Sequence, residues 1–163
     1  MIPRKARAVV STLATVALLG ASTTSADDLY KRFFCQAKHW RHIMPDGKGG
    51  VDAEMWHRCD LEIRINLSSY VLTVQLIAYT ITPGEHGEPE ENRAMPVVMY
   101  EHDYTEKPTS APGGDIVQVE YNKCVTGHWL VQWEQRYKIK DACRDKSSRG
   151  HAGPWMVTCP RRK

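Results

Sequence analysis

Beyond residue 26 the sequence lacks a hydrophobic run long enough to cross a membrane as a helix. Such a helix needs about 20 apolar residues, and the longest later stretch, 70–81, is interrupted by threonines and Gln75. The sequence also lacks a C-x-x-C pair, which argues against a structural zinc site, and it has no internal repeat. It contains neither a Gly-x-Ser-x-Gly elbow nor a glycine-rich phosphate-binding loop, so these signatures of serine hydrolases and nucleotide-binding proteins are absent.

The one sustained apolar run lies at the start of the chain. Three basic residues are followed by the run 8–19 (AVVSTLATVALL), and a small, polar segment then leads to Ala26. This order is typical of a secretory signal peptide, with Thr24 and Ala26 at the −3 and −1 positions of a cleavage site. We therefore expect a signal peptide at 1–26 and a single secreted, disulfide-bonded β domain at 27–163.

Without the signal peptide the chain has no excess charge of either sign. The full sequence has 22 Lys and Arg against 19 Asp and Glu, and three of the basic residues lie in the signal peptide, so the mature chain holds 19 of each. A balanced chain gives no electrostatic reason to bind nucleic acid, and we expect none as a partner. We expect no cofactor or metal either, because His39 and His42 have no carboxylate nearby in sequence that completes a ligand set.

All five cysteines lie in the mature part and should be mostly oxidised in an exported protein, which predicts two disulfides and one free cysteine. Cys35 and Cys59 flank one predicted junction between elements. The predicted last strand brings Cys159 near Cys124, although the predicted register places Cys124 on the opposite face and leaves Cys143 as an alternative partner. We expect a monomer, or a dimer joined through the unpaired cysteine.

The first part of the mature chain has helical spacing. Leu29, Phe33, Gln36 or Ala37, Trp40 and Ile43 recur at intervals of three and four residues, which predicts one N-terminal helix that ends at Pro45. The opposite face of this helix carries the basic residues Lys31, Arg32, Lys38 and Arg41. The helix would either dock on a sheet through its aromatic residues or contact a membrane surface through its basic face.

The rest of the chain has strand patterns. Alternating apolar and polar residues from Cys59 to Leu67 predict a half-buried strand. The apolar stretch 70–81 predicts a strand covered on both faces. Further strands are predicted over 95–104, with Pro96 at its start or on a sheet edge, and over 155–159. The segment 82–93 contains four glutamates, two prolines and two glycines, which predicts an exposed loop.

The stretch 115–140 has the pattern of a β-hairpin. A three-residue loop at 125–127, ending in a glycine, sets Val119 opposite Trp133 and Tyr121 opposite Val131 on one apolar face. The aromatic row on that face is interpreted as core. With the other strands, this hairpin predicts a mainly β fold, an antiparallel sandwich or small barrel of about six strands with one N-terminal helix.

Two groups of residues are candidates for chemistry or binding. His128, Glu134 and Arg136 share one strand face and resemble the base, acid and phosphate clamp of small secreted ribonucleases. His128 and Glu134 are six residues apart, however, which is about 20 Å along a strand and too far for one phosphate. The second group, Tyr100, His102 and Tyr104, shares one face of another strand and forms a partner surface with His86 of the 82–93 loop.

The segment Cys124-Val125-Thr126-Gly127-His128-Trp129 and the closing Val157-Thr158-Cys159-Pro160 resemble a loose class of small exported bacterial proteins. This resemblance implies a sandwich fold and assigns no catalytic residue. We therefore expect a non-enzymatic binding or interaction module for an extracellular protein or a glycan. The alternative is a small secreted hydrolase, ribonuclease-like or lipase-like, that uses His128 or His102 with a nearby carboxylate.

Overall fold

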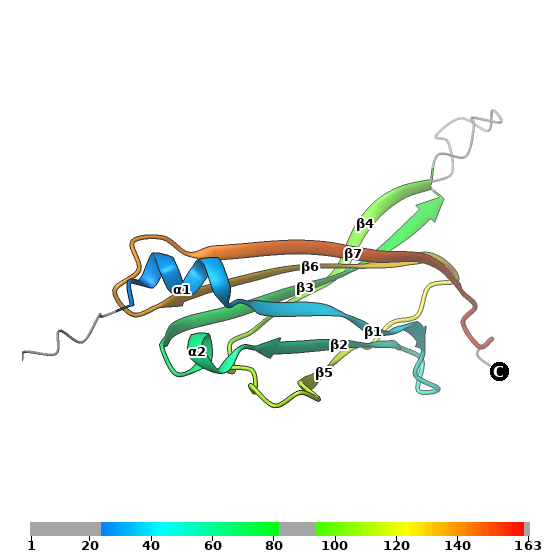
Figure 1. The fold of residues 1–163 in the computed structure, drawn as a ribbon. Helices are drawn as coiled ribbons and strands as arrows, with labels where there is room; N and C mark the ends of the chain where they lie inside the picture. The colour runs from blue at the N-terminus through cyan, green and yellow to red at the C-terminus, as the bar shows by residue number, and fades with distance from the viewer. Residues whose placement is uncertain (1–23, 82–93, 162–163) are drawn as a thin grey trace, which may run out of the picture.

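The computed structural model describes residues 24–81 and 94–161, in which seven antiparallel strands form two sheets packed face to face (Figure 1). The three-stranded sheet has the order β1-β2-β5, and the four-stranded sheet has the order β4-β3-β6-β7. The strands are β1 (Cys35–Pro45), β2 (Val51–Cys59), β3 (Leu67–Ile81), β4 (Ala94–Tyr104), β5 (Asp115–Tyr121), β6 (Gly127–Ile139) and β7 (Lys146–Val157), with two short helices, α1 (Ala26–Arg32) and α2 (Leu61–Arg64). The predicted mainly β, antiparallel sandwich is confirmed.

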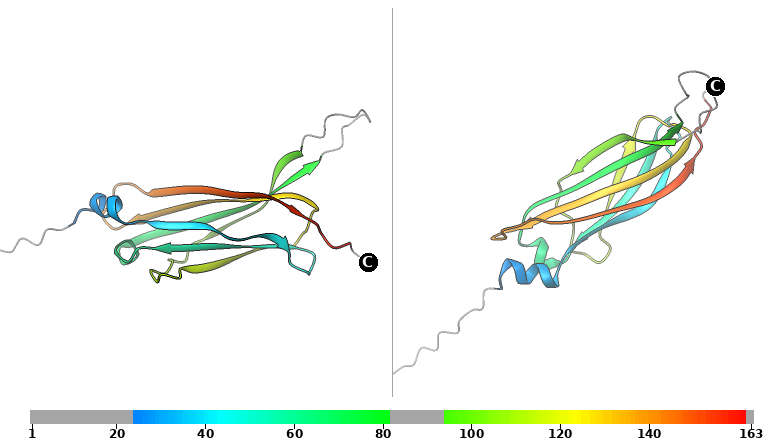
Figure 2. Two further views of the ribbon diagram at one scale, coloured as in Figure 1. Left: turned by 45° about the vertical axis from the view of Figure 1, so that its right-hand side comes forward. Right: turned by 90° about the horizontal axis from the view of Figure 1, so that it is seen from above.

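The core lies between the two sheets and follows the alternation of side chains along each strand. On β6, Trp129, Val131 and Trp133 point inward and are buried, while Gln132 on the other face is exposed. On β5, Val119 is buried in the same core. The predicted assignment of faces is therefore confirmed, including the interpretation of Trp129 and Trp133 as core residues. Figure 2 shows the two layers from two further directions, with the end of β3 and the start of β4 projecting beyond the sandwich.

The predicted hairpin at 115–140 is wrong. β5 pairs with β2 in one sheet, whereas β6 pairs with β3 and β7 in the other, so residues 122–126 cross from one sheet to the other. Alternation determines which face of a strand is buried, but it does not determine which strand lies beside it. Val119 and Trp133 face the same core from opposite sheets, which is why their pattern also fits two paired strands.

The predicted N-terminal helix is correct only at its beginning. The helix α1 ends at Arg32, and residues from Cys35 onward form β1, which pairs with β2. Cys35, Ala37 and His39 also alternate, so this stretch satisfies strand period as well as helix period. Trp40 is 57% exposed on β1 and does not dock a helix on the sheet. The basic helical face proposed for membrane contact is not formed, because two of its four cations lie on β1.

Two further strand predictions need correction. Residues after Cys59 form the short helix α2 rather than a strand, and Leu61 and Ile65 are exposed. The chain instead forms β2 before Cys59, a strand that was not predicted. The stretch 70–81 is the centre of the four-stranded sheet, as part of β3, but its outward side chains are only half-buried. The predicted loop 82–93 lies outside the described residues.

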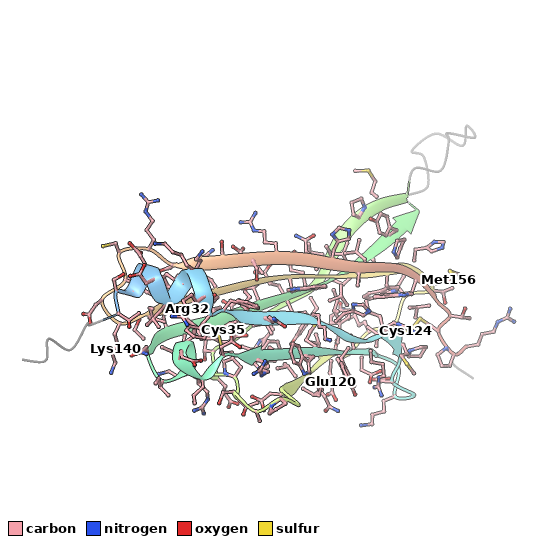
Figure 3. The ribbon with its side chains drawn as sticks, viewed as in Figure 1. Arg32, Cys35, Glu120, Cys124, Lys140 and Met156 are labelled. Atoms are coloured by element: carbon pink, nitrogen blue, oxygen red, sulfur yellow. A yellow bond between two sulfur atoms is a disulfide. The ribbon has the colours of Figure 1, made fainter. Side chains whose placement is uncertain are left out.

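The predictions for the edge strand with Pro96 and for two disulfides with one free cysteine agree with the structure. β4 is an edge strand that contains Pro96, and the last strand, β7, runs antiparallel to β6 but begins earlier than expected. Disulfides join Cys35 to Cys59 and Cys124 to Cys159, whereas Cys143 is free and exposed. The two disulfides lie at opposite ends of the sandwich (Figure 3). Neither helix in the described ranges is long and apolar enough to span a membrane.

Candidate functional site

A cleft opens along the side of the sandwich where the edge strands β4 and β5 lie near each other. The Tyr104 hydroxyl of β4 donates a hydrogen bond to the backbone carbonyl of Gln118 on β5, at 3.1 Å, and so joins the two sheets across this edge. The cleft has a volume of about 440 Å³. Its lining residues are His57, His102, Asp103, Tyr104, Thr105, Glu106, Lys107, Asp115, Ile116 and Val117.

His57 forms the inner wall of this cleft. It lies on β2, points between the sheets and is 3% exposed. Its Nδ1 atom is 2.8 Å from the hydroxyl of Tyr70 on β3, and Gln135 on β6 donates its amide to the same hydroxyl at 3.1 Å. Because Nδ1 is engaged in the core, Nε2 is the ring nitrogen that a molecule in the cleft can reach.

The charges around His57 come from the rim of the cleft. Asp115 is directly opposite His57 in the β2–β5 register, and its carboxylate accepts a hydrogen bond from the Thr109 backbone amide at 2.6 Å. Burial lowers the pKa of His57 below its ordinary value of 6.5, while the carboxylates of Asp115 and Glu106 act in the opposite direction. The net direction is downward, so the ring is neutral at pH 7.

Two members of the predicted partner surface on β4, His102 and Tyr104, line the other wall. The His102 ring lies 4.7 Å from the Tyr104 ring and 6.2 Å from the Tyr100 ring, so the three side chains make one row, as their spacing predicts. Asp103 points to the opposite face of β4 and accepts a hydrogen bond from the Thr73 hydroxyl at 2.6 Å. His86, the fourth predicted member of this surface, lies outside the described residues.

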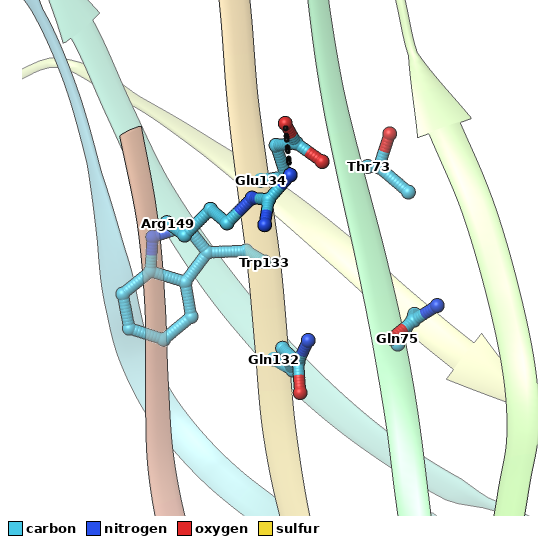
Figure 4. A pocket seen from close by; sticks show the side chains of 6 residues that line it. All are labelled: Thr73, Gln75, Gln132, Trp133, Glu134 and Arg149. Atoms are coloured by element: carbon cyan, nitrogen blue, oxygen red, sulfur yellow. Dashed lines mark hydrogen bonds and ion pairs between the residues drawn. The ribbon is translucent and has the colours of Figure 1, made fainter. Parts of the chain in front are cut away.

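The other predicted set lies on the outer face of the four-stranded sheet. A shallow pocket of about 270 Å³ there is lined by Thr73, Gln75, Gln132, Trp133, Glu134 and Arg149 (Figure 4). Arg136 and Arg149 each donate to the Glu134 carboxylate at 3.3 Å, and these hydrogen bonds, that from Arg136 above all, hold the pKa of Glu134 below its usual value.

His128 does not belong to that pocket. Its register partners are Tyr79 and Met156, whereas Glu134 lies opposite Thr73 and Arg149 further along the same strands. The structure therefore does not bring the predicted base, acid and clamp together, and Glu134 is engaged by cations instead.

The remaining histidines of interest lie at the opposite edge of the sandwich. His39 and His42 are on β1, and their rings lie 5.5 Å and 5.1 Å from the ring of Trp155 on β7. They form an aromatic contact between the two sheets at this edge. Across 24–81 and 94–161, no group of three or more His, Cys, Asp or Glu side chains is placed to hold a metal ion.

Sequence reasoning missed His57, Glu106 and Asp115 as members of one site. A signal for His57 was present, because it follows Val51, Ala53 and Met55 at alternate positions, with the charged Asp52 and Glu54 between the first three. This pattern predicts an inward-facing histidine on a strand. The approach of β5 to β4 has no comparable local signal, since the two strands belong to different sheets.

Comparison of the chain with protein-family models, with curated proteins and with solved structures finds no match, so its resemblance to a class of small exported proteins stays a prediction.

Proposed function

We propose that this protein is a secreted, non-enzymatic binding module that holds its ligand in the cleft between β4 and β5. The observation that carries the proposal is His57, a nearly fully buried histidine that lines the cleft and whose Nδ1 atom is already engaged by Tyr70. Its second ring nitrogen is therefore left for a hydrogen bond to a ligand in the cleft. The rings of His102 and Tyr104 add surface on the opposite wall, and Tyr100 extends their row beyond the cleft.

Secretion is supported by the covalent structure and by the start of the sequence. Two disulfides join strands or connections at the two ends of the sandwich, which is consistent with folding in an oxidising compartment. The signal-like segment 1–26 precedes this domain. A binding module of this kind would meet its ligand outside the cell.

The proposal is tested by mapping contacts on the exported protein with both disulfides intact. Soluble oligosaccharides and short peptides are titrated in turn, and backbone amide shifts are followed by NMR. We expect at least one probe to shift the amides of cleft residues such as Ile116 and Tyr104, and His57→Gln to weaken that probe at least tenfold. His128→Ala, on the outer face of β6, is the matched control and should bind as the wild type does. Shifts confined to another surface, or none from any probe, would reject the cleft as the binding site.

A hydrolase remains the second candidate because the cleft brings His102 near carboxylates. The cleft is lined by His102, His57, Glu106 and Asp115. It therefore offers more than one pairing of a histidine with a carboxylate for general acid–base catalysis. The exported protein is incubated with RNA, lipid and cell-wall substrates. Turnover that is lost in His102→Ala and kept in His128→Ala would establish catalysis in this cleft and overturn the binding proposal.

A further inference from the structure

A chain of hydrogen bonds begins at Ser148, an exposed residue of β7, and runs through the core to His57. The Ser148 hydroxyl on β7 donates to the Gln135 side-chain carbonyl at 3.3 Å, and the Gln135 amide donates to the Tyr70 hydroxyl at 3.1 Å. The Tyr70 hydroxyl oxygen thus receives one proton and still carries its own. Its neighbour in that direction is His57 Nδ1 at 2.8 Å. The order of donors makes Nδ1 an acceptor, which leaves the ring proton on Nε2.

The surroundings hold this arrangement in place. Gln135 is fully buried and Tyr70 is nearly so. Water therefore cannot replace the Gln135–Tyr70 or the Tyr70–His57 hydrogen bond without opening the core. Burial also raises the pKa of the Tyr70 hydroxyl, so Tyr70 keeps the proton that it donates at neutral pH.

The cleft facing Nε2 restricts the chemistry of its ligand. Two carboxylates, Glu106 and Asp115, line the cleft against one lysine, so an anionic ligand is disfavoured. A purely cationic ligand would leave the Nε2–H donor without an acceptor. A hydroxyl group meets both requirements, because it accepts from the imidazole and donates to a carboxylate. The Tyr104 ring and the partly exposed Ile116 offer apolar contact for C–H surface.

We infer that the cleft binds a neutral sugar, and that Ser148, Gln135 and Tyr70 act as positioning residues that keep His57 as an Nε2–H donor to one of its oxygens. This inference rests on the proposed binding function of the cleft and adds the class of ligand and the protonation of the ring. The step involves no covalent chemistry, only the exchange of water in the cleft for sugar hydroxyls.

The ring proton is tested first, by long-range ¹H–¹⁵N NMR of the imidazoles in the exported protein at pH 7. We expect the Nε2–H tautomer for His57 in the wild type and a mixture of tautomers in Tyr70→Phe. Because Tyr70→Phe disturbs a buried site, the adjacent pair Ser148→Ala and Ser147→Ala provides a milder comparison. Ser148→Ala should increase the Nδ1–H population, whereas Ser147→Ala, on the other face of β7, should not. An Nδ1–H tautomer in the wild type would overturn the inferred direction of the chain.

The ligand class is tested by titrating glucose, N-acetylglucosamine, cellobiose, glucuronate and trialanine, with the His57 ring signals and the Ile116 amide as readouts. We expect a neutral saccharide to shift both signals, glucuronate to bind at least tenfold more weakly, and Ser148→Ala to weaken the neutral saccharide severalfold. Tighter binding of glucuronate, or binding of trialanine alone in the cleft, would overturn the sugar inference and leave the binding function intact. No shift at the cleft from any probe would reject both.

Discussion

At the residue scale, the least typical side chain of this core is His57. A buried polar group without a hydrogen bond costs about 1–3 kcal/mol. His57 Nδ1 avoids this cost through its hydrogen bond with Tyr70, which Gln135 supports with a second hydrogen bond to the Tyr70 hydroxyl. The three residues come from three different strands of both sheets. Packing of the core does not require such a network, because an apolar side chain of similar size would fill the same space without hydrogen bonds. Its orientation toward a cleft gives it a role that packing alone does not.

The depressed pKa of His57 predicts a pH dependence of stability. As the pH falls through 6.5, the unfolded chain protonates this histidine before the folded protein does, so the unfolded state binds more protons in that range. The free energy of unfolding should therefore fall as the pH drops below 6.5, by at most about 1.4 kcal/mol per pH unit for this group. His57→Gln should lose that part of the slope in urea unfolding between pH 7 and pH 5. Val131→Ala, destabilised elsewhere in the core, should keep the wild-type slope; an unchanged slope in His57→Gln would contradict the assignment.

Two adjacent glycines before β5 predict opposite effects of one added methyl group. Gly114 has φ +65°, and a Cβ there would overlap the Trp56 indole, whereas a Cβ at Gly113 would have no atom within 4 Å. Gly114→Ala should therefore lower the free energy of unfolding by about 2–4 kcal/mol. Gly113→Ala should change it by less than about 0.5 kcal/mol, because its carbonyl still accepts from the Trp56 indole N–H. Chemical denaturation of both variants checks this, and equal effects would show that the Trp56 contact is not formed.

At the element scale, local patterns identified most strands and their faces but not their neighbours. Val119, Val131 and Trp133 were assigned to the core from alternation alone, and all three are buried. Their strands nevertheless belong to different sheets, because strand pairing depends on the whole chain rather than on a local pattern. The helix predicted for the stretch after Cys35 is wrong for another reason. The apolar residues of this stretch fit both helix and strand period, and it forms a strand because it pairs with β2.

The candidate site was predictable to a similar extent. The row of Tyr100, His102 and Tyr104 follows from period two on a single strand, and it forms. His57 lies on β2, a strand that the sequence analysis does not predict, so the inward direction of its side chain does not follow from that analysis. The contact of Tyr104 with Gln118 joins two sheets, and no spacing within either strand contains that information.

The cysteine pairing leads to a prediction on the elements that it joins. Cys35 and Cys59 are register partners at the ends of β1 and β2, so their disulfide fixes the entry into the three-stranded sheet. The double variant Cys35→Ala/Cys59→Ala should lower the free energy of unfolding by about 3 kcal/mol through loss of the loop constraint. Cys143→Ala should have no effect, since Cys143 is free and exposed. Thermal unfolding measures the difference, and peptide mapping without reductant should recover Cys35 with Cys59. A peptide that links Cys143 to Cys35 or Cys59 would contradict the structure.

At the scale of the whole molecule, the two sheets are held together at one end and along both open sides. The Cys124–Cys159 disulfide joins the crossover between the sheets to the segment after β7, whereas Cys35–Cys59 lies within the three-stranded sheet. The Tyr104–Gln118 hydrogen bond and the Tyr100–Tyr121 ring contact close one side, and the contact of His39 with Trp155 closes the other. The cleft lies beside the closure made by Tyr104, so this side chain both lines the cleft and joins the two sheets there.

Charge provides the last prediction, because it depends on the entire chain and on removal of its first segment. The full sequence has a net charge of +3 and an isoelectric point of about 8.6. Loss of residues 1–26 removes three cations and no anion, which leaves only the histidines and the terminal groups to set the balance near neutral pH. We therefore expect the exported protein to focus at about pH 7–7.5 and to be least soluble there.

Isoelectric focusing of the protein recovered from the medium, with the intact mass of the same band as control, checks this prediction. A mass that begins at Asp27 together with a near-neutral band would confirm cleavage after Ala26. A band near 8.6 with the mass of the full chain would contradict it, because the signal segment would then still be attached. A near-neutral protein has little long-range repulsion from neutral or zwitterionic surfaces. Its ligand would then be selected by the hydrogen-bonding groups of the cleft rather than by the field of the whole molecule.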